Sequence, residues 1–349
     1  MIDIARLKKM ADRYVFELNE SLYNAHENFI DKAWGPKSIR KNYSYLKWKF
    51  KSESNDCIPG LLVYKEGLEI NGQLGLIPDR VVINNEIIRC QWGCNFKTLQ
   101  EFEGSGIGAL LDIASLGKAE ITFGVNPTVQ SENIKLKLGF KLLEGPRIMM
   151  LPIDFKHVVA LKVPSKYNLA ISIASKAIRF YYHQRYRKVY KKVDSLCTTK
   201  AGGWKDIFEF LTAARSKINL PHVLHDVRFL EWRCNAFDTL RQQAQSVYTM
   251  NGGFILFNAA NPYLMINEYY FNTEAEAIQL INKCINIAKQ AGSRTIRVYA
   301  NSNEQELLLK SLGFIGLRNK IKIYAYTANK NINFGSAFHF DGYDGESNL

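Results

Sequence analysis

The sequence predicts a mixed α/β fold in which one structural unit occurs twice. The chain has 349 residues, which suits two domains at the usual size of roughly 150 residues each. Three landmarks recur in the same order in both halves, and strand-like and helix-like patterns alternate between them. The first-half landmarks are residues 45–50, 121–126 and 138–140, and their counterparts are residues 229–234, 296–301 and 312–314.

The first and last landmarks are the most distinctive. In the first, an aromatic residue, a Leu, a charged residue, a Trp and a basic residue follow one another, so that Trp48 corresponds to Trp232. The last landmark is Leu-Gly-Phe in both halves. Three matches in one order indicate a repeat rather than chance.

Within each repeat the patterns predict short strands, a longer strand, a helix, a strand, a second helix and a final strand. In the first repeat, the predicted strands are residues 60–64, 75–77, 80–83, 87–96 and 121–126, and a helix through Leu116 follows a glycine-rich turn at residues 104–108. This alternation indicates a mixed sheet in each half.

The second repeat has a well-marked middle helix. Thr273 and Glu276 form a capping-box pattern, apolar residues then recur at helical spacing from Ile278 to Ala288, and Gly292 ends the run. No glycine-rich turn precedes this helix, because residues 268–276 contain no Gly.

A basic segment joins the repeats. Residues 167–193 predict an amphipathic helix with Ile171 and Tyr182 on its apolar side and Lys176 and Arg179 on its basic side. Three interpretations are open: a linker helix packed on one domain, a site for a substrate phosphate, or contact with a membrane surface. For the phosphate, Tyr182 and Arg185 are the candidate substrate contacts.

Composition narrows the class of protein. The formal net charge of +13 favours an anionic partner, which includes nucleic acid, a membrane surface, a phosphorylated cofactor or a nucleotide-linked substrate. The first residues have no apolar core, and no apolar run reaches the roughly 18 residues of a spanning helix. We therefore expect a cytoplasmic protein without membrane insertion. The six scattered cysteines predict reduced core thiols, and Cys90 with Cys94 supplies too few ligands for a zinc site.

The chemical signal is the turn Gly104-Ser105-Gly106-Ile107-Gly108, between a strand and a helix. Alternating glycines let backbone N–H groups approach one anion, and the helix start adds a partial positive charge. A P-loop would need Gly-Lys-Ser/Thr here, and a Rossmann fingerprint would lie near a first strand. The turn therefore predicts a phosphate site of another kind.

The turn and Leu138-Gly139-Phe140 together resemble the GNAT (GCN5-related N-acetyltransferase) superfamily, over residues 45–154. The resemblance implies tandem GNAT-like domains, each a mixed, mostly antiparallel sheet flanked by helices. Residues 1–160 would bind acyl-CoA, residues 161–220 would form a basic helical linker, and residues 221–349 would be a degenerate second domain that helps to form the acceptor site.

The resemblance also implies that acyl-CoA is the cosubstrate, with no metal. Backbone groups would contact the pantetheine and thioester at Phe96, Lys97, Thr98 and Leu99, and the pyrophosphate at Gly104, Ser105, Gly106, Ile107 and Gly108. Catalysis would consist of positioning an amine and stabilising an oxyanion.

Two positions depart from the family pattern. Glu103 stands where an Arg or Gln is usual, and Lys135 stands where many relatives carry a tyrosine that protonates the leaving thiolate. No acid or base therefore carries over from the family. The candidates for catalysis are Asn126, at the end of a strand, and His339 and Asp341, in an aromatic C-terminal stretch.

The candidate acceptor contacts are Trp92, as a wall for the acyl group or sugar, and His222, in a His222–His225–Asp226 cluster that begins the second repeat. Core packing of Trp92 and a surface loop for the His222 cluster are the alternatives. The chain resembles two-domain GNAT proteins that acylate nucleotide-linked (dTDP or UDP) amino sugars for surface polysaccharides such as O-antigen. We expect such small-molecule substrates, no nucleic acid partner, and a monomer or weak dimer. The alternatives are an aminoacyl-tRNA-dependent peptidoglycan ligase and a catalytically inactive binding protein of this fold.

Overall fold

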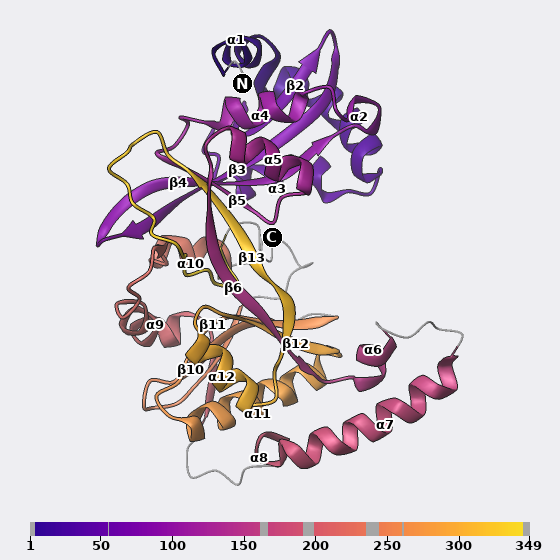
Figure 1. The fold of residues 1–349 in the computed structure, drawn as a ribbon, viewed down its shortest axis with the longest axis vertical. Helices are drawn as coiled ribbons and strands as arrows, with labels where there is room; N and C mark the ends of the chain where they lie inside the picture. The colour runs from indigo at the N-terminus through magenta and orange to yellow at the C-terminus, as the bar shows by residue number, and fades with distance from the viewer. Residues whose placement is uncertain are drawn as a thin grey trace.

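The computed structural model describes residues 4–54, 56–160, 167–190, 199–234, 244–259 and 262–344. Its strands form one mixed sheet in the order β1-β2-β3-β4-β5-β13-β6-β12-β11-β10-β9-β7, with β8 paired to β3. The molecule is elongated, with the first repeat at one end and the second at the other (Figure 1). In the described part of the chain, no helix is both long and apolar enough to cross a membrane.

The first repeat holds α1 to β6. Its helices are α1 (Ile4–Tyr14), α2 (Tyr23–Trp34), α3 (Tyr43–Lys49), α4 (Ile107–Ser115) and α5 (Val129–Lys137). Its strands are β1 (Val15–Asn19), β2 (Cys57–Glu66), β3 (Glu69–Ile83), β4 (Glu86–Thr98), β5 (Ile121–Val125) and β6 (Lys141–Pro152). The short runs expected at residues 75–77 and 80–83 are one long strand, β3, which forms a hairpin with β4.

The connecting helices are α6 (Phe155–Ala160), α7 (Asn168–Arg185) and α8 (Arg187–Tyr190), and the second repeat begins with β7 (Lys200–Gly202) and α9 (Phe208–Arg215). It continues with β8 (His222–Val223), α10 (Val227–Cys234), β9 (Gln245–Tyr248), β10 (Phe254–Ala259), β11 (Tyr263–Tyr270), α11 (Glu274–Gln290), β12 (Thr295–Ala300), α12 (Asn303–Ser311) and β13 (Ile315–Tyr326). Cys197 and the end of the basic segment beyond residue 190 lie outside the described residues.

The two repeats exchange their final strands. β13, from the second repeat, lies between β5 and β6, where Ile323 pairs with Val125 on one side and with Leu143 on the other. β6, from the first repeat, pairs in turn with β12. These two long strands run side by side through the middle of the molecule, from the first repeat to the second (Figure 1). The sheet is therefore continuous through both repeats.

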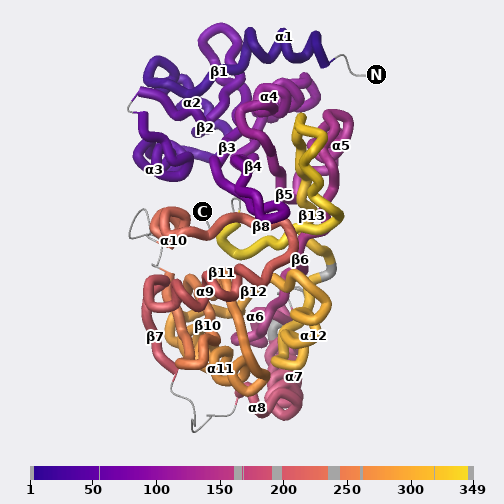
Figure 2. The backbone as a smooth tube through the Cα atoms, turned by 90° about the vertical axis from the view of Figure 1, so that its left-hand side faces the viewer, coloured from indigo at the N-terminus to yellow at the C-terminus, as the bar shows by residue number. Residues whose placement is uncertain are grey.

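Three apolar clusters fill the molecule. One packs α4 and α1 on one face of the first repeat, and a second packs α11 and α12 on the sheet of the second repeat. The largest lies on the other face of the first repeat and extends to α10 and the C-terminal segment. Figure 2 shows this segment and α10 between the two halves. The core thus joins the repeats.

The mixed α/β tandem architecture predicted from the sequence is confirmed. The middle helix of the second repeat has the predicted start, since the Thr273 side chain accepts from the Glu276 N–H at 3.2 Å. The capping box is incomplete, because the Glu276 carboxylate accepts from the N–H of Asn272, at 2.8 Å. The helix ends at Gln290, and Gly292 has a φ of 70°. The basic segment is two helices, with Tyr186 between α7 and α8.

Candidate functional site

A gap opens between the parallel strands β4 and β5. They pair only from Cys90 to Gly93 and from Ile121 to Gly124, and beyond these residues a cavity of about 200 Å³ lies between their ends. It is lined by Gly93, Cys94, Asn95 and Phe96 of β4, by Leu74 of β3, by residues 124–128, and by Ser131 and Lys135 of α5. The ends of two strands that no longer pair therefore line this space.

A β-bulge shapes the β4 side of this gap. Asn95 has a φ of 47°, and the register of β4 on β3 shifts here, so that Asn95 and Phe96 face Leu74 alone. The Asn95 side-chain oxygen accepts from Lys49 Nζ and Arg40 Nε, each at 3.3 Å. A bulge re-aims backbone groups next to a site, and these bonds hold it in place.

The bulge rests on a buried polar network. The side-chain amide of Gln73 donates to the Asn95 carbonyl at 3.2 Å, and the Gln73 oxygen bonds His26 Nε2 at 2.9 Å. Burial lowers the pKa of His26 to about 4, so this ring is neutral at physiological pH. The sequence analysis missed this network, and its only local signal was an Asn, a residue that tolerates positive φ, inside an apolar strand.

The glycine turn has the conformation that its residues predict. Gly104 and Gly106 have φ values of 84° and 91°, and a Cβ on either would meet no atom within 4 Å. Gly106 precedes α4, whose first N–H groups have no partner within the helix. A Cβ at Gly108 would lie 3.0 Å from the Phe96 ring. Because Phe96 also lines the cavity, this side chain lies between the cavity and the turn.

Glu103, the departure from the family pattern, lies beside this turn. Its side chain is exposed, and its backbone N–H donates to the Gln100 carbonyl at 3.2 Å. That N–H is therefore already used within the chain, and the donors toward an anion come from the start of α4.

Lys135 and Asp112 form a buried ion pair at the α5 side of the gap. Lys135 Nζ lies 2.6 Å from Asp112 Oδ1, and the two side chains are 9% and 1% exposed. A Cβ at Gly124 would lie 3.0 Å from Lys135 Cε, so a larger residue there would press on the lysine where it crosses β5. Burial raises the pKa of Asp112, and Lys135 opposes that rise. Lys135 thus brings a cation to the cavity wall.

Solved structures share this architecture. A GCN5-related N-acetyltransferase from Kribbella flavida matches with a TM-score of 0.59 and 13% identity, over 90% of this chain and 70% of that one. One from Anabaena variabilis matches with a TM-score of 0.59 and 11% identity, over 90% and 72%. Saccharomyces cerevisiae N-myristoyltransferase with bound myristoyl-CoA matches with a TM-score of 0.55 and 11% identity, over 81% and 73%.

The chain has the GNAT fold. No family model matches the sequence, and no curated protein does so either. At these identities the likeness concerns architecture alone, and the activity has to be argued from the residues of this chain.

Asn126, the first catalytic candidate, lies at the gap of this GNAT fold. It lines the cavity with a φ of 43°, and its Oδ1 accepts from the Lys322 N–H of β13 at 2.9 Å. Asn126 does not cap α5, because the cap is Thr128, whose hydroxyl accepts from the Ser131 N–H at 3.3 Å. The side-chain oxygen of Asn126 is thus already used in a hydrogen bond from β13.

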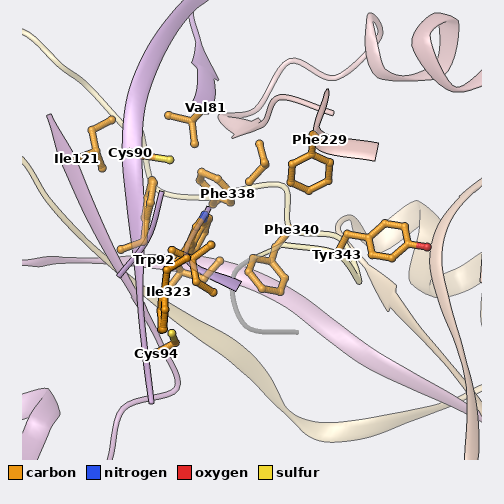
Figure 3. Packing of buried hydrophobic residues seen from close by; sticks show 14 of the residues in the cluster. Val81, Cys90, Trp92, Cys94, Ile121, Phe229, Ile323, Phe338, Phe340 and Tyr343 are labelled. Atoms are coloured by element: carbon orange, nitrogen blue, oxygen red, sulfur yellow. The ribbon is translucent and has the colours of Figure 1, made fainter. Parts of the chain in front are cut away.

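Trp92 does not form a wall of the cavity. Its side chain is 1% exposed, stacks on Phe123 at 4.4 Å between ring centroids and meets Phe338 and Phe340 edge-on (Figure 3). Side chains alternate along a strand, and that of Trp92 points to the large core on the opposite face from α4. The proposed acyl or sugar contact at Trp92 is corrected to core packing.

Tyr182 and Arg185 lie on α7, against the second repeat. Tyr182 is buried and its hydroxyl donates to the Gly313 carbonyl, while Arg185 is exposed and its guanidinium bonds Tyr181 at 3.1 Å. Neither residue lines the gap between β4 and β5 or another of the cavities found in the described part of the chain. The structure thus gives no support for a phosphate site at these two residues. Because Leu169, Ile173 and Phe180 of α7 are exposed, the linker and membrane-surface interpretations of the basic segment both stay open.

His339 and Asp341 are close together, as a catalytic pair would be, but they belong to a buried charge cluster. The His339 ring lies 3.1 Å from Asp341, which also pairs with Arg215 at 2.8 Å. Burial disfavours the ionised form of the Asp341 carboxyl group, but His339 and Arg215 favour it more strongly. The pKa of Asp341 therefore lies below its usual range. A carboxylate so stabilised is a weak base, and neither residue lines the gap between β4 and β5.

The same cluster holds His225. Its Nε2 lies 2.7 Å from Asp344, its Nδ1 bonds Glu268, and Arg215 pairs with Glu268 at 3.1 Å. His225, Glu268 and Asp341 lie close enough together to hold a metal ion, but the Arg215 guanidinium already pairs with both carboxylates. His222 is a separate residue, whose Nδ1 bonds the Leu220 carbonyl at 2.8 Å, and burial lowers its pKa to about 4.

We expect folding stability to fall between about pH 6.5 and 9. Burial and Arg215 disfavour the charged His225 ring, but Glu268 and Asp344 outweigh them and raise its pKa to about 9. Folding raises the pKa of His225, so the charged ring stabilises the folded state at pH values below the unfolded pKa of about 6.5. This contribution to the free energy of unfolding, about 3 kcal/mol, is lost as the pH rises to 9. Urea unfolding across this range should show the loss, and a His225→Gln variant should show a flat profile. An equal slope in both proteins would contradict the assignment.

The equivalent gap in the second repeat is filled by the C-terminal segment. β11 and β12 pair only from Tyr263 to Met265 and from Thr295 to Arg297. Beyond them, the Phe340 N–H donates to Asn301 Oδ1 at 2.8 Å and the Gly342 N–H to the Asn267 carbonyl at 3.0 Å. A Cβ at Gly342 would lie 2.7 Å from Asn267 Cα, so only a glycine fits. The gap of the first repeat is therefore the one left for a substrate.

Proposed function

We propose that this protein transfers an acyl group from acyl-CoA to the amine of a nucleotide-linked (dTDP or UDP) amino sugar. The observation that carries the proposal is the open gap between β4 and β5, with Phe96 between it and the glycine turn at the start of α4. An extended amide-bearing chain suits diverging strands, because their ends offer unpaired backbone groups. A pyrophosphate suits the N–H groups at a helix start.

The residues at the gap suit acyl transfer by positioning and electrostatics. The bulge at Asn95 and Phe96 lines the cavity, where backbone N–H donors would stabilise charge on a thioester oxygen. The Lys135 ammonium, at the opposite wall, would stabilise negative charge on a departing sulphur. A base for the incoming amine is not among the side chains that line this cavity.

The test is thiol release from acyl-CoA in the presence of amine acceptors. We expect release when dTDP- or UDP-linked amino sugars are added, and little with the free sugars. Silence across a panel of acyl donors and amines would refute acyl transfer, while CoA binding without turnover would indicate a binding protein. If thiol release required an aminoacyl-tRNA, the result would favour the aminoacyl-tRNA-dependent ligase over the sugar acyltransferase.

Gly106→Glu tests the pyrophosphate position. A carboxylate at the start of α4 would repel a pyrophosphate by about 2 kcal/mol, so we expect CoA to bind roughly 30-fold more weakly. Gly35→Glu is a matched control, because Gly35 has a φ of 90° and equally open surroundings at the end of α2. Calorimetric titration with CoA measures both. Equal affinities in the two variants would place the pyrophosphate elsewhere.

A further inference from the structure

A second cavity lies where the two repeats meet. It has a volume of about 750 Å³ and is bordered by α3, by the β3–β4 hairpin and by α10. The two repeat landmarks form one of its walls: the rings of Trp48 and Trp232 lie 5.9 Å apart between centroids, and Trp232 Nε1 donates to the Trp48 carbonyl at 2.9 Å. Both repeats are thus needed to build this wall.

The charged side chains that line this cavity are mostly basic. Two are carboxylates, Glu53 and Asp79, and six are basic: Lys47, Lys51, Arg80, Arg89, Lys118 and Arg228. Three of the basic side chains also pair with a carboxylate outside the lining: Arg80 with Asp226, Lys118 with Glu17 and Arg89 with Glu120. An excess of one sign of charge in a cleft concentrates ligands of the other sign.

Lys51 is the cation at the centre of this arrangement. Its φ of 50° is rare for a residue with a side chain. Its Nζ lies 3.9 Å from the centroid of the Trp232 ring and 3.8 Å from the Asp79 carboxylate. Strained backbone that persists is over-determined by its surroundings and clusters at ligand sites. The lysine is thus fixed beside an aromatic wall.

An adjoining cavity extends the basic cavity along β3 and β4. It has a volume of about 510 Å³, shares Lys51, Pro78, Gln91 and Lys118 with the basic cavity and also reaches Leu76. The lining of the gap starts at Leu74 and Gly93, two residues further along the two strands. Residues two apart lie on the same face of a strand, roughly 7 Å from one another. The adjoining cavity and the gap therefore lie close together on the sheet, with the buried side chains of Leu74 and Leu76 between them.

We infer that this basic cavity binds the nucleoside diphosphate of the acceptor, with the attached sugar directed toward the gap. Its volume suits a small-molecule ligand, Lys and Arg are the usual partners of phosphate, and Trp48 supplies an aromatic surface for a base. The inference rests on the proposed function for the identity of the acceptor. The binding itself requires only these cations and the aromatic wall.

The experiment titrates UDP and dTDP into the protein without CoA, by calorimetry, beside a separate titration with CoA. We expect at least one diphosphate to bind, more weakly as salt rises. The variant Arg89→Gln/Arg228→Gln removes two exposed cations and should weaken diphosphate binding at least about tenfold, because two phosphate contacts are lost, while CoA affinity stays the same. Lys289→Gln, an exposed change on α11, is the matched control.

Three outcomes would overturn the inference. Neither diphosphate binds at millimolar concentration, or the double variant and the control bind a diphosphate equally well. The third outcome is that tRNA, titrated in the same way, binds and the diphosphates do not. Failure of the proposed function looks different, since diphosphate would then bind while CoA does not. Lys51→Gln adds a check inside the cavity. If it folds, it should weaken diphosphate binding as well, and unchanged affinity in that variant would also count against the site.

Discussion

A Lys135→Met variant is expected to lose acyl-transfer activity by roughly 10³-fold in kcat, with little change in the affinity for CoA. Lys135 lines the gap and is the cation at its α5 wall. A fixed charge in a water-poor site stabilises a developing anion without reorganisation, which is the kind of interaction whose loss costs 10²- to 10³-fold. Single-turnover thiol release measures the chemical step directly.

The structural role of the Lys135–Asp112 pair has to be separated from this effect. Removing the lysine alone leaves the buried Asp112 carboxylate without its partner, which typically costs about 3–5 kcal/mol. Asp112→Asn/Lys135→Met removes both charges, and we expect it to recover most of the stability in urea unfolding. If the double variant also recovers activity, the lysine is only a structural partner of Asp112.

The repeat and the glycine turn are predictable because both depend on local signals. Trp48 and Trp232 stand in matching local sequences, and Gly104 and Gly106 occupy positions where φ is positive, which few other residues tolerate. The mixed α/β class follows from periodicity alone. What these signals do not contain is which strand lies beside which.

The strand exchange is the clearest example. β6 and β13 each follow a helix and a Leu-Gly-Phe segment, so local patterns equally suit pairing within one repeat. The observed pairing depends on contacts far apart in sequence, such as Ile323 with Val125. The same holds for the basic cavity, whose cations come from α3, the β3–β4 hairpin and α10 rather than from the basic segment that composition singles out.

The position of the C-terminal segment cannot be predicted for a related reason. Its aromatic residues and its His–Asp pair contain no local signal for the gap that the segment fills. Charge decides this: Arg215, on α9, is buried and pairs with both Glu268 on β11 and Asp341 in the segment. A cation with two partners fixes the segment across the second gap. His339 and Asp341 therefore lie away from the gap between β4 and β5.

An Arg215→Met variant is therefore expected to lose about 3–5 kcal/mol of stability, because two buried carboxylates would lose their common partner. Urea unfolding measures the loss, and Arg185→Met, which changes an exposed arginine on α7, should alter stability by less than about 0.5 kcal/mol. CoA affinity of the folded Arg215 variant should be unchanged, because the open gap lies in the other repeat. A parallel loss of CoA affinity would mean that the filled gap and the open gap are coupled, and the two repeats would then have to be treated as one site.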